Sequence, residues 1–157
     1  MSKDLSKRAK EIIEQIQYVT IASVDKDGMP WNAPVFTAYD EQYNFYWGTH
    51  KQSQKAQNID RKPDVFLVIY DSTVPAGTGE GVYIKATARQ ITTPDEVKRA
   101  FDLLKSRHAE SFWDFAAVSE AGPIRLYKAT PQKAWMNDDG HKDGHYIDIR
   151  TEIELGQ

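Results

Sequence analysis

The sequence predicts a mainly β domain of the α+β class, a small closed antiparallel barrel decorated with helices. Six or seven short segments with strand patterns follow one another along the chain, and most neighbours are separated only by short polar turns. Three or four segments show helical spacing, which is too few to place a crossover helix after each strand of a parallel sheet. The 157 residues form one domain of ordinary size.

Composition narrows the classes of function. Apolar residues make up 40% of the chain and charged residues 27%, as in folded globular proteins. Twenty Lys plus Arg against 23 Asp plus Glu give a formal charge of −3, so no basic excess attracts nucleic acid. The absence of cysteine excludes disulfides, thiolate metal sites and a cysteine nucleophile. Because no apolar run suits export or reaches the ~20 residues of a membrane span, we expect a cytoplasmic protein.

The N-terminal third predicts a helix followed by a hairpin. Apolar residues recur at helical spacing through about residue 16, so this helix should pack on an apolar surface. Strands at 18–24 and 30–39 flank the polar turn DKDG (25–28), in which Gly28 can adopt a positive φ. Further strands are predicted at 43–49, 65–71, 81–91, 124–136 and 145–155.

Two helix starts and two polar loops complete the pattern. Thr93, Pro94 and Glu96 form a capping box that predicts a helix to about residue 105, and 111–118 predicts a second helix. The glycines of GTGEG (77–81) precede a strand and lack the GK[ST] ending of a phosphate loop, so turn chemistry explains them. The segment NDDGHKDG (137–144) is expected to be a polar loop between the last two strands.

The stretch FYWGTHKQSQKAQNI (45–59) carries the strongest chemical signal. It begins as a strand and ends as a helix whose N-cap position is occupied by Ser53, and a helix start attracts anions. Thr49 and Ser53 supply hydroxyl donors while Lys51 and Lys55 supply cations, which suits a terminal phosphate. The alternative is a capped helix beside two solvated lysines.

A metal site is a weaker possibility in the last polar loop. Its carboxylates and imidazoles are the right ligand types for a divalent metal, but Asp and Gly also favour hairpin turns, and no complete metal motif is present. We therefore expect no metal from the loop residues Asp138, Asp139, His141, Asp143 and His145.

From about residue 8 to 136 the chain resembles the pyridoxamine 5′-phosphate oxidase-like split-barrel family of flavoproteins, especially its small general-stress-protein branch. The segments YVTIASVDKDGMPWNAPVF, YNFYWGTHKQSQKAQNIDRKPDVFLVIYD and GVYIKATARQI carry the resemblance. Its most specific parts are D-x-D-G-x-P in the first hairpin and the S-x-K of Ser53 and Lys55. The resemblance implies a six-stranded antiparallel split barrel with flanking helices, here an N-terminal helix (1–17), a barrel core (18–136) and a C-terminal strand extension (137–157).

The resemblance also implies a homodimer that holds FMN in two equivalent clefts at the subunit interface. Ser53 and Lys55 match the family's phosphate contacts, and residues 35–37 match a strand whose backbone faces the isoalloxazine and hydrogen-bonds its pyrimidine edge. Trp135 is either a flavin neighbour from the other subunit or a core or interface tryptophan. The full set of candidate cofactor-binding residues is Asn32, Val35, Phe36, Thr37, Trp47, Gly48, Thr49, Lys51, Ser53, Gln54, Lys55 and Trp135.

Departures from the family pattern limit the functional prediction. Asn32, Thr37 and Gln54 stand where the oxidase has charged phosphate partners, and YIDIRTEIELGQ lacks the oxidase's arginine-bearing segment that grips pyridoxal phosphate. We expect an FMN-dependent oxidoreductase that acts on a small molecule or takes electrons from a nicotinamide cofactor, without a named catalytic residue, and that does not oxidise pyridoxamine phosphate. The alternatives are a flavin carrier or stress-response protein without turnover, a haem binder that uses His141 or His145, and a deazaflavin binder.

Overall fold

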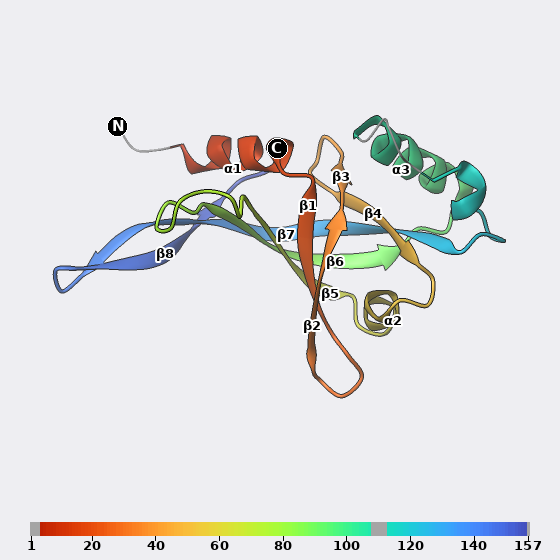
Figure 1. The fold of residues 1–157 in the computed structure, drawn as a ribbon, viewed down its shortest axis with the longest axis horizontal. Coiled ribbons are helices and arrows are strands. Elements are labelled where there is room, and N and C mark those ends of the chain that lie inside the picture. Colours follow the sequence, from red (N-terminus) through yellow and green to blue (C-terminus); the bar gives the residue numbers. More distant parts are fainter. Residues whose placement is uncertain (1–3, 108–112, 157) are drawn as a thin grey trace.

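The computed structural model describes residues 4–107 and 113–156. Its strands form one antiparallel sheet in the order β2-β1-β5-β6-β7-β4-β3, with β8 paired to β7 (Figure 1). This architecture confirms the predicted mainly β fold with flanking helices. The elements are α1 (Leu5–Gln15), β1 (Tyr18–Val24), β2 (Pro30–Phe36), β3 (Ala38–Tyr39), β4 (Phe45–His50), α2 (Gln54–Arg61), β5 (Asp64–Tyr70), β6 (Gly81–Gln90), α3 (Pro94–Arg107), the 3-10 helix η1 (Phe115–Val118), β7 (Ile124–Lys142) and β8 (His145–Ile153).

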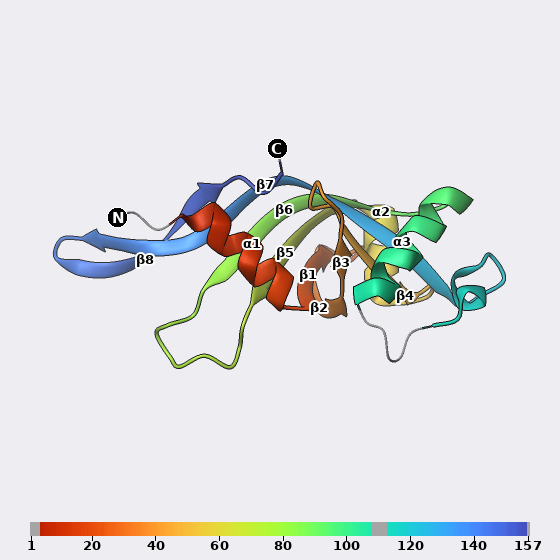
Figure 2. The same cartoon turned by 90° about the horizontal axis from the view of Figure 1, so that it is seen from above.

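The helices cover the sheet in two places. α1 buries Ala9, Ile12 and Ile13 in the main apolar core, as its sequence periodicity predicts. α3 contributes to a smaller apolar cluster with β4 and β7. α1 and α3 lie on the upper side in Figure 1 and α2 on the lower side, and Figure 2 shows α1 and α3 from above. α2 follows β4 in the chain and contributes Ala56 and Ile59 to the main core.

Arg107 joins the first and third helices. Its guanidinium donates to the carbonyl oxygens of Ile13 (2.7 Å) and Ile16 (2.9 Å), which lie at the C-terminal end of α1. A helix leaves its last carbonyl groups without intrahelical donors, so a cation there satisfies them and interacts favourably with the helix dipole. The end of α1 is thus fixed by a residue from a distant part of the chain.

The predicted strand 30–39 is two strands. It breaks at Thr37, whose backbone N–H donates to Gln17 O (3.0 Å) instead of joining a ladder. β2 then pairs with β1, whereas the short β3 pairs with β4. The residue pattern on both sides of Thr37 suits a strand, and only the change of partner reveals the break.

The prediction of a polar loop at 137–144 is wrong. β7 continues through Lys142, and the turn consists of Asp143 (φ 52°) and Gly144 (φ 78°). Two consecutive residues with positive φ are typical of a two-residue hairpin turn whose twist matches that of the strands. Gly140 permits the continuation because a side chain there would collide with Ile149 and Ile147 across the ribbon. The resulting β7–β8 arm projects from the body of the molecule (Figures 1 and 2).

Two helix predictions also need correction. Residues 111 and 112 of the expected helix 111–118 lie outside the described residues, and the described part contains the 3-10 helix η1. Glu96 was expected to complete a capping box but instead accepts hydrogen bonds from Arg89 at 2.6 and 3.1 Å. A strong cationic partner on a neighbouring strand outcompetes the backbone N–H.

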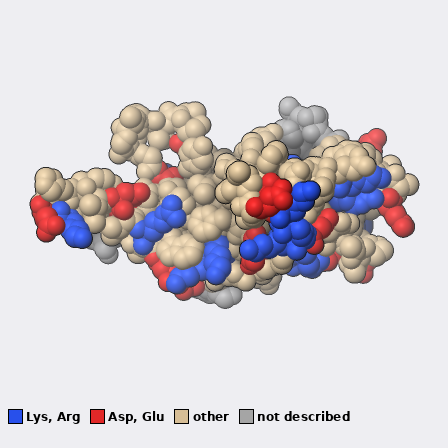
Figure 3. Space-filling model, turned by 90° about the horizontal axis from the view of Figure 1, so that it is seen from below, with Lys and Arg blue, Asp and Glu red and all other residues tan. Residues whose placement is uncertain are grey.

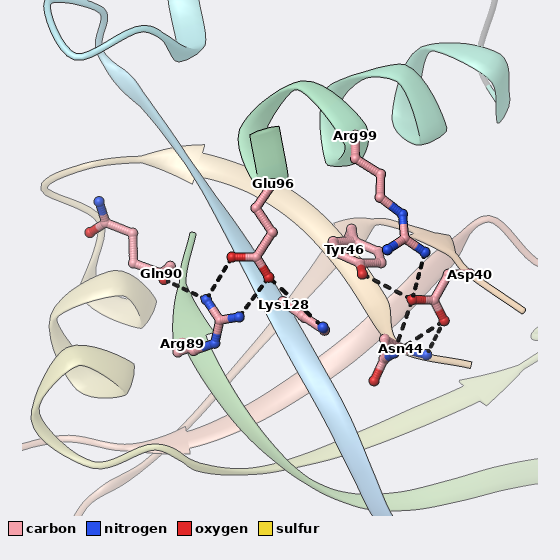
Figure 4. A network of polar contacts seen from close by, with 8 residues as sticks. All are labelled: Asp40, Asn44, Tyr46, Arg89, Gln90, Glu96, Arg99 and Lys128. Carbon is pink, nitrogen blue, oxygen red and sulfur yellow. Dashed lines mark hydrogen bonds and ion pairs between the residues drawn. The ribbon is translucent and has the colours of Figure 1, made fainter. Parts of the chain in front are cut away.

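A polar network links β3, β4 and α3 (Figure 4). The buried Asp40 carboxylate accepts hydrogen bonds from Asn44 Nδ2 (2.9 Å) and the Tyr46 hydroxyl (2.9 Å), and Arg99 lies 3.7 Å away. Burial and the hydrogen bond to Asp40 raise the pKa of Tyr46 to about 12. An adjacent groove of about 560 Å³ is bordered by residues 39–41 and by α3, including Arg99. Because the carboxylate's acceptor sites are used by protein donors, we interpret this network as structural.

No helix within residues 4–107 and 113–156 is both long and apolar enough to cross a membrane.

Candidate functional site

The end of β4 and the start of α2 form a polar corner, here named the phosphate corner and defined by Thr49, Lys51, Ser53 and Lys55. Ser53 is the N-cap of α2, as predicted, and its Oγ accepts the N–H of Ala56 at 3.2 Å. Thr49 Oγ1 donates to Ser53 Oγ at 3.0 Å. The capping bond leaves the other amides of the first turn without intrahelical acceptors, so they remain suited to an anion.

Lys55 is the cation that best fits an anion ligand at this corner. Its side chain is half-buried, and burial lowers the pKa of the ammonium below the usual lysine value. Among the ion pairs of the described residues, none includes Lys55. A partly desolvated ammonium without a counter-ion gains more from an anion than a solvated one does.

Lys51 lies at the rim of the corner on an ordered turn. Its backbone N–H donates to Pro123 O at 3.0 Å, and the N–H of Ser53 donates to His50 O at 2.9 Å. The side chain of Lys51 is exposed. The backbone is therefore held in place while the ammonium is free to approach a ligand.

Gln54 does not point its amide at the corner. Its Nε2 donates to Asn58 Oδ1 (2.7 Å), and Asn58 Nδ2 donates to Ser23 Oγ (3.0 Å). Asn58 and Ser23 are buried, so this chain of hydrogen bonds anchors α2 to β1. Sequence analysis missed Asn58, whose spacing of four residues from Gln54 was the available signal.

Three of the four candidates within residues 32–37 present little polar surface. Val35 and Thr37 are buried, and Thr37 uses both its N–H and its hydroxyl on Gln17 O. The expected hydrogen bond from the Thr37 amide to a flavin ring is therefore not available without a rearrangement. Phe36 is half-buried, and Asn32 is exposed opposite Ala22 of β1.

Trp47 and Gly48 face opposite sides of β4. The Trp47 side chain is fully buried and stacks on Tyr127 (ring centroids 5.8 Å apart), so only its backbone could follow a ligand. Its indole Nε1 is buried without a hydrogen-bond partner among the described residues. On the other face the indole of Trp113 lies against Gly48, where an added Cβ would come within 2.3 Å of the ring.

We predict that Gly48→Ala displaces the Trp113 indole and destabilises the fold by about 1–3 kcal/mol, the usual cost of overpacking. The measurement is the free energy of unfolding in denaturant, together with the near-ultraviolet circular dichroism of tryptophan. Gly79→Ala is the matched control, because a Cβ there meets no atom within 4 Å. Equal stabilities of the two variants would contradict the close contact between Trp113 and β4.

Trp135 lies far from the phosphate corner in the same chain. It is half-buried on β7, stacked on Phe66 with centroids 6.2 Å apart, and the Lys133 ammonium lies 5.5 Å from its ring. Arg125, ten residues earlier on β7, is the residue paired with Thr49. At about 3.3 Å per residue, Trp135 is about 30 Å from the corner along the strand. One chain therefore does not gather all the predicted site residues.

The residues of the β7–β8 arm do not form a metal cluster. Within the part of the chain that the structure describes, no three His, Cys, Asp or Glu side chains are placed to hold one metal ion. The strand pairing places Asp139 opposite Asp148 and His141 opposite Tyr146. His141 contacts the Tyr146 ring edge to face, with centroids 6.1 Å apart.

Comparison with protein families decides the classification. Residues 5–138 match the family model described as pyridoxamine 5′-phosphate oxidase. The chain belongs to the pyridoxamine 5′-phosphate oxidase family. No curated protein matches it.

Solved structures of other proteins share this fold at low sequence identity. HutZ, named as the heme storage protein of Vibrio cholerae, is 16% identical over 91% of this chain and 100% of its own, with a TM-score of 0.71. A protein of Bacteroides thetaiotaomicron named for 5-nitroimidazole antibiotic resistance is 15% identical over 83% and 81%, with a TM-score of 0.68. A Listeria innocua protein named for pyridoxamine 5′-phosphate oxidase is 18% identical over 83% and 95%, with a TM-score of 0.64.

The phosphate corner of this family member suits a phosphate-bearing cofactor. It offers a half-buried cation, a second cation at the rim, two hydroxyls and the N-terminal amides of α2. Figure 3 views the molecule from below, the side on which α2 lies in Figure 1, and shows clusters of Lys and Arg side chains interspersed with acidic ones on this face. The corner can therefore hold a phosphate monoester, although Asn32, Thr37 and Gln54 add no charge to it.

Proposed function

We propose that this member of the pyridoxamine 5′-phosphate oxidase family is an FMN-dependent oxidoreductase of cytoplasmic location whose phosphate corner holds the cofactor's terminal phosphate. The observation that supports this most strongly is Lys55, a half-buried ammonium with no ion-pair partner among the described residues, at the start of α2. Thr49 donates its hydroxyl proton to Ser53 Oγ at the end of β4, which leaves the Ser53 hydroxyl proton available to an anion. Few other ligands would use this combination of donors as fully as a phosphate monoester does.

The chain's own residues bind and orient the cofactor. Bound FMN supplies transfer of a hydride or of electrons through its isoalloxazine ring. Lys55, Lys51 and the first amides of α2 hold the phosphate, which fixes the distance of the ring from the end of β4. Gly48 has no side chain, and the indole of Trp113 lies against the backbone of β4 where a Cβ would project. No protein acid or base is assigned to the reaction, so positioning is the proposed contribution of these residues.

The proposal includes a homodimer with the cofactor at the subunit interface. Trp135 is about 30 Å along β7 from the residue that pairs with Thr49, so it can approach a flavin only if that flavin is held by a second copy. Phe66 and Trp135 stack on the sheet as partly exposed aromatic rings, and aromatic residues of this kind are enriched at protein interfaces. Light scattering should give the mass of two chains, and a strictly monomeric, flavin-loaded protein would contradict this arrangement.

The substrate is proposed to be a small molecule other than pyridoxamine phosphate, or a nicotinamide electron donor. Arg150, the arginine of the C-terminal segment, lies over the Tyr83 ring, with its guanidinium carbon 3.8 Å from the ring centroid. This cation–π contact gives Arg150 a partner within the chain. We expect no turnover of pyridoxamine phosphate, and turnover at ordinary enzyme rates would contradict this expectation.

Visible absorption spectroscopy tests the proposed function. The purified protein is titrated with FMN and then, under anaerobic conditions, with NADH and NADPH. We expect a bound-flavin spectrum that bleaches on addition of one donor. A bound flavin that resists both donors would favour a flavin carrier. Absence of FMN binding would overturn the proposal, and titrations with haem and a deazaflavin would then test the alternative cofactors on the same fold.

A further inference from the structure

The 119–123 segment is organised around a single side chain, Arg125 at the start of β7. Nη1 donates to the carbonyl oxygens of Gly122 (2.9 Å), Ile124 (2.9 Å) and Ser119 (3.3 Å), and Nη2 donates to Glu120 O (3.0 Å). Four carbonyl groups thus converge on one guanidinium, whose planar set of N–H donors suits several acceptors at once.

The segment has little freedom to adopt another path. The N–H of Gly122 donates to Ser119 O at 2.9 Å, and an added Cβ at Gly122 would collide with Ala117 O at 2.2 Å. Among the described residues Arg125 has no carboxylate partner, so its charge is balanced by carbonyl dipoles alone. Arg125 is therefore the central support of this loop.

The same loop reaches the phosphate corner. Pro123 O accepts the backbone N–H of Lys51 at 3.0 Å. Arg125 is also the residue directly opposite Thr49 in the pairing of β4 with β7, which places their Cβ atoms about 5 Å apart. Arg125 consequently lies next to Thr49 at the corner, and the loop that it holds supports the backbone of Lys51.

We propose that Arg125 is a positioning residue for the phosphate corner, which fixes the backbone of Lys51 through the 119–123 loop. This inference rests on the proposed function. Its ligand class is a phosphate monoester. Both terminal nitrogens of Arg125 donate to loop carbonyls, so its proposed role is to hold the loop and not to bind the phosphate. The positions of Asn32, Thr37 and Gln54 supply no charge to the phosphate, so Lys51 is proposed to supply it instead. Because Lys51 lies on a turn, its contribution to phosphate binding depends on how firmly that turn is held.

A comparison of FMN with riboflavin, which lacks the phosphate, tests the proposal. Dissociation constants of both are measured by flavin fluorescence for the wild type, Arg125→Met and Arg125→Lys, and Lys98→Met on the exposed face of α3 is the control for one lost charge. We expect both Arg125 variants to bind FMN about five- to tenfold more weakly while riboflavin binding stays within twofold. Lysine keeps the positive charge but has too few donors to bond all four carbonyl groups. If Arg125→Lys binds FMN with wild-type affinity, the proposal is overturned. Equal losses for FMN and riboflavin would overturn it as well.

A double-mutant cycle tests whether Arg125 acts through Lys51. In a Lys51→Met background, Arg125→Lys should no longer change FMN affinity, whereas fully additive effects would contradict the mechanism. Thermal unfolding establishes that each variant is folded. If Arg125→Met does not fold, Arg125→Lys alone is sufficient for the test. If wild-type protein binds no FMN, the proposed function itself fails. Normal FMN binding by the wild type and by both Arg125 variants would reject only the role of Arg125.

Discussion

Replacing Lys55 with alanine should weaken FMN binding by about 1.5–3 kcal/mol, a roughly 10- to 150-fold rise in Kd. The half-buried ammonium has no ion-pair partner among the described residues, so a phosphate would be its principal counter-ion. Removal of the charge leaves the hydroxyls and amides of the corner, with the exposed Lys51 at its rim as the remaining cation. Isothermal titration calorimetry with FMN gives the affinity directly.

Lys62→Ala provides the matched control for this prediction. Lys62 is the exposed C-cap of α2, so its removal changes the net charge equally but at the opposite end of the same helix. We expect its FMN affinity to stay within about twofold of the wild type, because surface charges at that distance are screened by salt. Equal losses in both variants would show a general charge effect, and unchanged affinity in Lys55→Ala would place the phosphate elsewhere.

The pH dependence of FMN binding gives a second signature of Lys55. Burial lowers the pKa of Lys55, so the free protein should lose this cation, and affinity for FMN, at a lower pH than an exposed lysine would. Affinity should also fall below about pH 6, where the phosphate gains its second proton. The alkaline loss should be absent from Lys55→Ala, whereas the acidic loss should remain. An alkaline loss of the same size in Lys55→Ala would contradict the assignment.

Asp40→Ala is expected to lower the free energy of unfolding by about 3 kcal/mol, the largest stability effect that we predict. The buried carboxylate accepts from Asn44 N (2.9 Å), Asn44 Nδ2 (2.9 Å), Gln42 N (3.0 Å) and the Tyr46 hydroxyl (2.9 Å). Its loss leaves several of these donors buried without an acceptor, which costs more than the hydrogen bonds contribute. Urea unfolding at neutral pH measures the change.

The stabilisation from Asp40 should disappear in acid. Burial favours the neutral form, but the hydrogen bonds from Asn44, Tyr46 and Gln42 outweigh it and hold the pKa of Asp40 below its usual value. A carboxyl with a lowered pKa in the folded state contributes stability above its unfolded pKa and loses it as the pH falls through the folded value. The difference in stability between wild type and Asp40→Ala should therefore shrink progressively as the pH falls below about 4.

Asp102→Ala is the control for the Asp40 prediction. Asp102 forms an exposed ion pair with Lys98 on α3 (2.9 Å), for which we expect a change below about 1 kcal/mol. Similar destabilisation by the two substitutions would show that burial of the Asp40 network adds nothing to the free energy of unfolding.

Local patterns in the sequence predicted most elements correctly. The helical stripe that ends near Ile16, the DKDG turn with Gly28 at φ 84° and the N-cap at Ser53 are all present. In each case the residues that specify the element are close neighbours in the chain. Ser53 and Lys55 of the S-x-K motif are also close neighbours in the chain, and both lie at the start of α2.

The errors arose where a distant partner decided the outcome. Polar composition predicted a loop at 137–144, but pairing with β8 extends the strand through Lys142. Glu96 had the spacing of a capping residue, yet Arg89 on β6 binds its carboxylate. Distant contacts also hold the side chain of Gln54, whose role at the phosphate stays a prediction: its amide donates to Asn58, which donates to Ser23.

By itself the sequence determined the helix and strand periods, the turn residues, the start of α2 at Ser53 and the exclusion of cysteine chemistry, because each depends on the residues present or on their short-range spacing. Only the tertiary structure decided that Lys55 is half-buried without a carboxylate among the described residues, that Arg125 lies opposite Thr49, and that Trp135 is far from the corner. The reason is that strand register and burial arise from pairing between distant segments, which no local pattern specifies.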